Sequence, residues 1–205
     1  MGVIKKGGIL LVMAVVLATS VVASGEKTMV TLKTSMGDIT LELYPEKAPA
    51  TVKNFLQYVD DGFYKDTIFH RVINTFMIQG GGFDCNMAKK ETRSPVKNEA
   101  GNGMKNERGT IAMARTMVPD SATAQFFINT VDNHNLDFKN PTQQGIGYCV
   151  FGRVTNGMDV VDKIRSVATG TKCGMRDVPQ TDVVIKDMAR VVKPKVASEV
   201  DQVTP

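Results

Sequence analysis

The sequence predicts a mainly β domain, an antiparallel barrel or sandwich that is capped by two helices. Several short runs alternate between apolar and polar residues, and this alternation is typical of a strand with one buried face. Only two segments have apolar residues at helical spacing. Strands and helices do not alternate regularly along the chain, so the pattern of a parallel α/β sheet is missing from the sequence.

The length and composition are typical of one globular domain. The chain has 205 residues, of which 42% are hydrophobic and 22% charged, enough to bury a sizeable core. The net charge is +4, and without Lys5 and Lys6 it falls to +2, because 23 basic residues then face 21 acidic ones. The basic residues are scattered and not interleaved with aromatic ones, which argues against a nucleic-acid-binding surface.

The N-terminus has the pattern of an export signal. Lys5 and Lys6 precede the apolar run Ile9–Ala18, and Val21–Ala23 ends in a small residue suited to cleavage. We therefore expect a signal peptide over residues 1–23 and an exported mature protein.

A retained membrane anchor is the alternative reading of the same segment. No charged residue occurs from Gly7 to Gly25, a span close to the lower limit for crossing a bilayer. The small and polar residues that follow Leu17 favour cleavage over retention. A cleaved signal leaves a protein without stable membrane insertion.

The predicted domain, residues 28–192, opens with a hairpin and a helix. The alternating runs Val30–Lys33 and Ile39–Leu43 flank Met36–Asp38, which has the turn chemistry of a β-hairpin. A helix is expected over Ala50–Asp61, where apolar residues recur at helical spacing. Pro49 suits the first turn of this helix, and a glycine follows its end.

The remainder of the chain is predicted from its alternation and its turn residues. Residues 84–108 are polar and rich in turn formers, and they indicate a long ordered loop of the kind that is often functional. The other expected elements are strands at Gly109–Ala114, Gln125–Thr130, Gly147–Val154 and Asp182–Val192, a helix between Met158 and Val167, and a disordered tail over residues 193–205.

The cysteines and histidines do not predict a metal site. Cys85, Cys149 and Cys173 are an odd number without metal-ligand spacing, and the chain has only 2 histidines. Cys149 lies among apolar residues and is expected to be a small buried side chain. Whether any two cysteines pair is left open by the sequence. Neither a metal nor a cofactor is predicted.

Arg71 is the most informative single residue, because it lies in the apolar and aromatic segment Phe69–Gly81. A guanidinium keeps its proton in a protein, so it either has a partner or faces a groove where its donors are needed. A solvent-facing arginine with an ordinary ion pair is the structural alternative. The neighbouring His70 is expected to point to the opposite face of the strand and to be structural.

Four blocks of sequence together resemble one known family: Phe69–Phe83, Gly109–Arg115, Ser121–Asn129 and Tyr148–Gly152. In their order and spacing they are similar to the cyclophilins, which are peptidyl-prolyl cis-trans isomerases, and the similarity extends from about Val30 to Val192. The connection between Pro95 and Gly103 resembles bacterial rather than animal members. The resemblance implies a closed, antiparallel, eight-stranded β-barrel capped by two α-helices.

The resemblance assigns catalytic roles to Arg71, Gln79 and Phe76. Arg71 is the expected donor to the nitrogen of a twisted X-Pro amide, and Gln79 helps to position Arg71 and the substrate carbonyl. The resemblance also implies a set of substrate-binding residues. Phe76, Met77, Phe127 and Leu136 form the wall of a proline pocket, and Gln125 with the backbone of Ala114 and Arg115 holds the residue before the proline.

The rim of the expected pocket departs from the family pattern. Many members have tryptophan or phenylalanine just before the leucine of the rim, whereas this chain has Asn135. Tyr148 lies near a position that is often histidine in animal members. We expect both residues to reshape the rim, and we expect weak inhibition by cyclosporin-type ligands with catalysis largely kept.

The function implied by the resemblance is peptidyl-prolyl isomerisation in exported proteins. Slow X-Pro steps in folding take tens to hundreds of seconds without a catalyst. The expected partners are unfolded or partly folded polypeptides that contain proline, the expected location is the periplasm, and the expected state is a monomer. A module that binds proline segments without turning them over is the competing function, and the presence of Arg71 and Gln79 argues against it.

Overall fold

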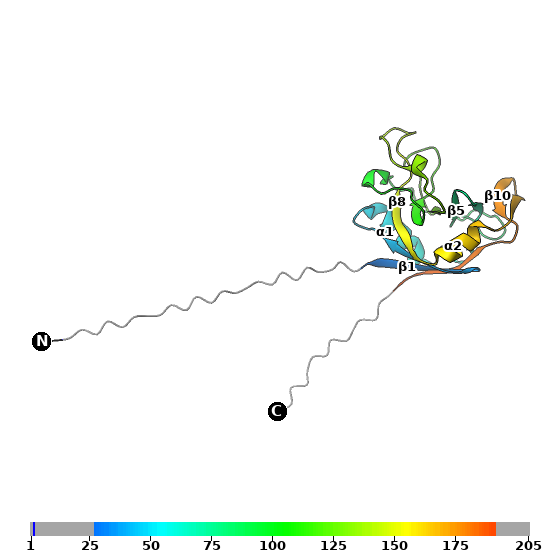
Figure 1. Ribbon diagram of the computed structural model, residues 1–205, viewed down its shortest axis with the longest axis horizontal. Coiled ribbons are helices and arrows are strands. Elements are labelled where there is room, and N and C mark those ends of the chain that lie inside the picture. The colour runs from blue at the N-terminus through cyan, green and yellow to red at the C-terminus, as the bar shows by residue number, and fades with distance from the viewer. Residues whose placement is uncertain (1, 3–26, 192–205) are drawn as a thin grey trace, which may run out of the picture.

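The computed structural model describes residue 2 and residues 27–191 (Figure 1). The expected cleavage site after residue 23 and the expected tail over residues 193–205 lie outside the described residues. No helix in the described part of the chain is long and apolar enough to cross a membrane.

The described residues form one large sheet, a separate hairpin, two α-helices and two short 3-10 helices. The helices are α1 (Pro49–Asp60), α2 (Met158–Arg165), η1 (Ala100–Asn102) and η2 (His134–Leu136). The strands of the large sheet are β1 (Thr28–Thr34), β2 (Gly37–Leu43), β3 (Thr67–Ile68), β4 (Arg71–Ile73), β5 (Met77–Gly80), β6 (Thr110–Met113), β7 (Phe126–Asn129), β8 (Val150–Asn156) and β11 (Val184–Arg190). The separate hairpin consists of β9 (Thr169–Lys172) and β10 (Met175–Pro179).

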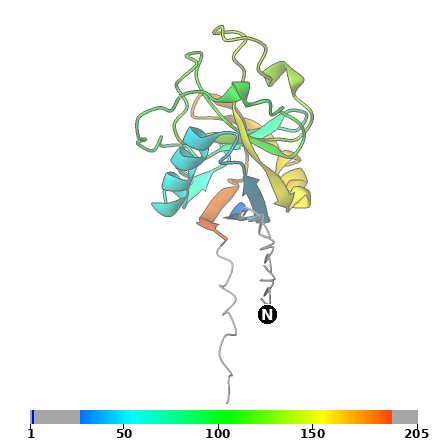
Figure 2. The ribbon, with the colours of Figure 1, turned by 90° about the vertical axis from the view of Figure 1, so that its left-hand side faces the viewer.

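The large sheet is antiparallel throughout and curls around the core. Its strand order is β3-β11-β1-β2-β8-β6-β7-β5-β4. Figure 2 shows α1 and α2 on opposite sides of the curled sheet. The mainly β class, the antiparallel pairing and the two α-helices predicted from the sequence are therefore confirmed.

The expected closed barrel of eight strands is met only in part, because the sheet of the described residues has nine strands and two edges. The difference arises between β3 and β4, where Phe69 and His70 leave the ladder. The Phe69 amide donates instead to the carbonyl of Val183, 2.9 Å away. β3 and β4 are the two edge strands of the sheet, and Phe69 and His70 join them along the chain. The two edges are therefore connected by the chain itself and not by a ladder of hydrogen bonds.

The main core lies inside the curled sheet and is covered by α1. Phe55 of α1 is completely buried, and its ring centroid lies 5.0 Å from that of Phe151 on β8 and 5.8 Å from that of Phe126 on β7. Burying an aromatic side chain of this size stabilises the fold by about 1.5 to 3 kcal/mol, and edge-to-face packing adds to it. Alternate residues of β1, such as Val30 and Leu32, complete the core from the sheet.

The structure corrects one local prediction and adds one hairpin that was not predicted. The hairpin turn lies at Ser35 and Met36, and Gly37 is already the first residue of β2. The Thr34 hydroxyl causes this shift, because it accepts from the Met36 amide at 3.0 Å and donates to the Gly37 carbonyl at 2.6 Å. The β9–β10 hairpin was not predicted at all, because its strands are short and largely polar and their residues do not alternate between buried and exposed.

Candidate active site

The β4–β5 hairpin places two of the predicted catalytic side chains side by side. Arg71 of β4 is the direct cross-strand partner of Gln79 on β5. Directly opposite residues project from the same face of a sheet, whereas neighbours along a strand project from opposite faces. Val72 accordingly faces the core and is 2% exposed, while 42% of the Arg71 side chain is exposed.

The same outer face continues across β7 and β6. Gln79 is opposite Phe127, and Phe127 is opposite Ala112. Phe127 and Ala112 form a second apolar cluster with Met77 and Val150, distinct from the core inside the sheet. The alternation of side chains along β4 to β7 therefore builds a core on one face and an apolar floor on the other.

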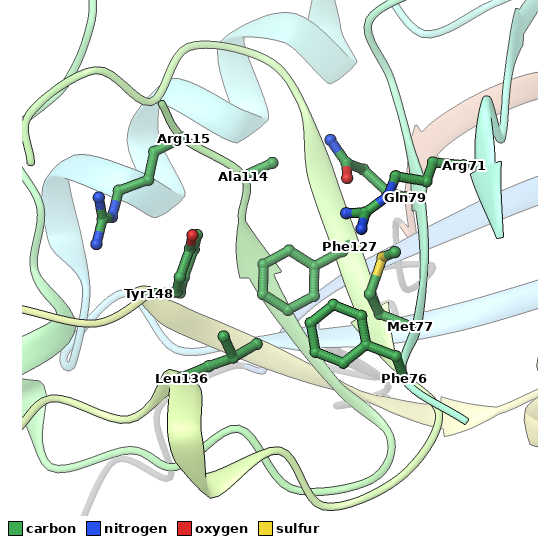
Figure 3. Close-up of a pocket in the computed structure, with 9 residues that line it drawn as sticks. All are labelled: Arg71, Phe76, Met77, Gln79, Ala114, Arg115, Phe127, Leu136 and Tyr148. Carbon is green, nitrogen blue, oxygen red and sulfur yellow. The ribbon is translucent and has the colours of Figure 1, made fainter. Parts of the chain in front are cut away.

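A pocket of about 100 Å³ opens above this floor (Figure 3). The four predicted wall residues form its apolar part, whereas Arg71 and Gln79 lie on one side and Arg115 and Tyr148 on the other. Nine residues line the pocket: Arg71, Phe76, Met77, Gln79, Ala114, Arg115, Phe127, Leu136 and Tyr148.

The polar side of the pocket is held by two contacts. The Gln79 side chain donates from Nε2 to Oε1 of Gln125 at 2.9 Å, which fixes the orientation of both amides. The Arg71 Nε lies 4.0 Å from Oδ2 of Asp177 on β10. Arg71 is therefore flanked by Gln79 within its own sheet and by a carboxylate from the separate hairpin.

Arg115 ties the opposite wall together. Its Nε donates to the carbonyl of Gly147 at 2.9 Å, and its guanidinium carbon lies 4.5 Å from the ring centroid of Tyr148. The Tyr148 ring in turn meets Phe127 edge to face at 5.8 Å. A cation over an aromatic face is favourable, so Arg115 serves as a brace for this wall as well as a charge at its rim.

Leu136 reaches the pocket from the short helix η2, which is anchored by buried amides. The Asn133 Nδ2 donates to the Phe76 carbonyl at 2.8 Å and to Oδ1 of Asn129 at 2.7 Å. After η2, Asp137 accepts from the backbone amide of Asn106 at 2.7 Å. Partial burial acts to raise the pKa of Asp137, but the hydrogen bonds from Asn106 and His134 outweigh it and hold this pKa below its usual value.

The structure brings together nine of the eleven predicted site residues in one pocket. Gln125 lies just outside this pocket, and it lines two adjacent cavities and contacts Gln79. Asn135 is exposed on η2 and is not among the residues that line the pocket. The functional roles of these residues stay predictions.

Asp177 was missed, since no strand was predicted around it and a lone aspartate in a polar segment gives no signal.

Two other predictions concern groups near the site. His70 is 4% exposed, and its ring centroid lies 4.6 Å from that of Phe83. Burial, assisted by the charge of Arg71, lowers the pKa of His70 to about 4, so the imidazole is neutral at physiological pH.

Cys149 is buried as expected, and burial raises the pKa of its thiol to about 11. The described residues contain no group of three or more side chains that could hold a metal ion.

Comparison with known proteins agrees with this arrangement. Residues 29–190 match the family model described as cyclophilin type peptidyl-prolyl cis-trans isomerase/CLD. The chain is 61% identical over 160 residues to peptidyl-prolyl cis-trans isomerase B of Escherichia coli, covering 78% of this chain and 98% of that protein. It is 57% identical over 158 residues to a peptidyl-prolyl cis-trans isomerase of Acinetobacter baylyi, covering 77% of this chain and 82% of that protein.

A solved structure shows the same architecture. The crystal structure of a cyclophilin type peptidyl-prolyl cis-trans isomerase from Cryptosporidium parvum is similar with a TM-score of 0.68 and 26% sequence identity. The similarity covers 82% of this chain and 100% of that chain. A second structure of that protein was obtained in the presence of the dipeptide Ala-Pro, and it matches with a TM-score of 0.66.

Proposed function

Since the chain belongs to the cyclophilin-type peptidyl-prolyl cis-trans isomerase family and is an isomerase of X-Pro bonds, we propose that it assists the folding of exported proteins and uses Arg71 as its catalytic donor. One observation carries the assignment of Arg71. Its guanidinium lies at the rim of a small apolar pocket that can take a proline ring. Proline-containing segments of unfolded or partly folded polypeptides are the substrates.

The reaction requires a twisted amide to be stabilised. Rotation about the C–N bond breaks amide resonance against a barrier of about 18 to 20 kcal/mol, and the nitrogen becomes pyramidal and basic on the way. A donor aimed at this nitrogen interacts more strongly with the twisted state than with the planar ground state, so it lowers the barrier. A permanently charged guanidinium on an apolar wall supplies such a donor without any covalent step.

The polypeptide on either side of the proline must be held while the bond turns. In the proposed complex the ring occupies the floor formed by Phe76, Met77 and Phe127, which excludes water from the twisting amide. The residue before the proline lies along Gln125 and the end of β6, where it is held much as an added strand is held by a sheet edge. The protein crystallised in the presence of Ala-Pro supports a substrate of this class.

The assignment of Arg71 is tested by replacing it with alanine. We expect Arg71→Ala to lower kcat/KM by roughly 100-fold or more, a loss of about 3 kcal/mol of transition-state stabilisation, in a proline peptide isomerisation assay. The matched control is Arg153→Ala, because Arg153 is an exposed arginine on β8 that pairs with Glu42 away from the pocket. The control should keep its rate. An Arg71→Ala variant with the rate of the wild type and a normal fold would refute the role of Arg71.

The proposed location rests on the export pattern at the N-terminus. A cleaved signal would release the mature protein into the periplasm, where polypeptides arrive unfolded and their X-Pro steps are slow. Mass spectrometry of the protein recovered from the periplasm tests this proposal. A mature N-terminus near Ser24 supports it, whereas an intact N-terminus in the membrane fraction indicates a tethered protein.

A further inference from the structure

Two further cavities adjoin the proline pocket on the side of Gln125. The larger has a volume of about 540 Å³ and extends from Arg71 to the β9–β10 hairpin. The smaller, of about 210 Å³, extends from Gln125 toward Lys89. Both are lined by Gln79, Arg115 and Gln125, and the first two of these residues also line the proline pocket. The three cavities are therefore adjacent, and we refer to the two cavities beside the proline pocket together as the groove.

The charged side chains of this groove are nearly all basic. Arg71, Arg115 and Arg176 line the larger cavity, and Lys89 lines the smaller one. Asp177 is the one carboxylate among the lining residues, and it lies beside Arg71 at 4.0 Å. Within residues 27–191, neither Arg176 nor Lys89 takes part in an ion pair.

The backbone holds these two basic residues at the groove. Arg176 lies at an irregularity of the β9–β10 ladder, between Met175 and Val178, and such bulges redirect side chains next to active sites. Lys89 is paired with Phe83 through an isolated bridge, which fixes the loop that carries it. Lys89 is therefore held by its own bridge and Arg176 by the paired residues on either side of it, although both side chains are exposed.

We propose that this groove is an extended substrate subsite that prefers an acidic side chain three residues before the proline. The inference rests on the proposed position of Gln125 beside the residue that precedes the proline. From Gln125 the preceding part of the polypeptide enters the basic cavities, and their volume accommodates a glutamate or aspartate. A carboxylate bound there supplies the partner that Arg176 and Lys89 lack within the described chain.

The size of the preference follows from the exposure of the charges. A single exposed ion pair contributes little, but several charges of one sign around a cleft act together on a bound carboxylate. We expect a gain in kcat/KM of about 3- to 10-fold for an acidic substrate over its neutral analogue at low ionic strength. Because salt screens exposed charges, this ratio should approach about 1 at roughly 1 M salt.

The experiment compares two peptides that differ only in whether one side chain ends in a carboxylate or in an amide. Peptides with glutamate or glutamine three residues before the proline are turned over by the full chain, and the rates are measured by NMR exchange without a coupling protease. A ratio that favours glutamate and falls with salt supports the proposal. A ratio near 1 at low salt would overturn it. Failure of the wild type to turn over either peptide would contradict the isomerase assignment instead, so the two failures are distinguishable.

Charge-matched variants locate the effect. Arg176→Gln and Lys89→Gln should each lower the glutamate to glutamine ratio by about 2-fold or more, and Lys89→Gln provides an independent reading if Arg176→Gln fails to fold. Lys186→Gln is the control, because Lys186 is an exposed residue of β11 outside the groove and its loss changes the net charge equally. A ratio lowered as much by Lys186→Gln as by Arg176→Gln would show a general charge effect and overturn the proposal.

Discussion

His70 and Arg71 are neighbours in the chain, yet one side chain is buried and the other is half exposed. Burial lowers the pKa of His70 to about 4 from its ordinary value of 6.5, and the neighbouring Arg71 adds to this effect. Between these two pH values the unfolded chain binds a proton that the native chain does not. The free energy of unfolding therefore falls as the pH falls through this window, by about 3 kcal/mol for His70 alone.

We expect His70→Gln to remove this part of the pH dependence. In urea unfolding measured at about pH 7 and about pH 4, the wild type should lose more stability than the variant, and the difference between the two losses should be about 3 kcal/mol. Carboxylates such as Asp137 contribute to both proteins, so they cancel in this comparison. Equal losses in the two proteins would show that His70 titrates normally in the native state.

Asn135 permits a second test at the scale of one residue. It precedes Leu136 on η2 and is exposed, so the rim lacks the large apolar side chain that many cyclophilins have there. Asn135→Phe should strengthen inhibition by cyclosporin by about 10-fold or more, because a buried aromatic contact is worth about 1.5 kcal/mol or more. Turnover without the inhibitor should change little. Nanomolar inhibition of the wild type in the same assay would contradict the role given to Asn135.

At the scale of elements, the N-terminus of α1 is capped by a residue far away in the sequence. The residue before the helix, Ala48, makes no side-chain cap. Glu99 takes this role, because its carboxylate accepts from the backbone amides of Ala50 at 3.1 Å and Thr51 at 2.8 Å. A negative charge at this end also interacts favourably with the helix dipole.

Glu99→Ala should therefore lower the free energy of unfolding by about 1 to 2 kcal/mol, which corresponds to a fall in Tm of roughly 2 to 8 °C. Glu91→Ala is a suitable control, because Glu91 is exposed in the same long loop and has no hydrogen bond or ion pair within the described chain. Calorimetry or urea titration measures both. A fall in stability that is equal in the two variants would exclude a specific cap.

The long elements were predicted because their sequence patterns are local. The apolar spacing in α1 and the alternation in β1 and β2 depend on burial of one face, and that burial is what the structure shows. The cap from Glu99 could not be predicted, since the sequence separation between donor and acceptor leaves no local pattern. The β9–β10 hairpin was missed for a related reason, because its strands bury few side chains and so lack alternation.

Most residues that line the pocket were named from the sequence, and the reason is the resemblance to a known family. The alternation of Arg71 and Val72 places one outward and one inward, but only the family pattern indicated that residues from β4, β6, β7 and η2 meet in one pocket. Asp177 falls outside that pattern, and its contact with Arg71 depends on a left-handed backbone at φ 62° in a bulged strand. Such a contact is a property of the tertiary structure.

At the scale of the whole molecule, the first and last strands of the domain lie next to each other within the sheet. β1 pairs with β2 on one side and with β11 on the other, and β11 also pairs with β3. The core residues Ile185 and Met188 belong to β11 and are at most 4% exposed. The two terminal strands of the domain therefore pair with each other inside the sheet, and the stability of the domain depends on both of them being present.

This arrangement predicts where the chain can be shortened. A fragment of residues 27–191 keeps every pair of the sheet, so its kcat/KM should stay within about 2-fold of the full chain and its Tm within a few degrees. A fragment that ends at residue 183 lacks β11, loses two ladders and exposes the core face of β1, and it should not fold. Circular dichroism and the proline peptide assay measure both fragments. An inactive or unfolded 27–191 fragment would show that residues beyond this range contribute to the domain, and the boundary inferred from strand pairing would be wrong.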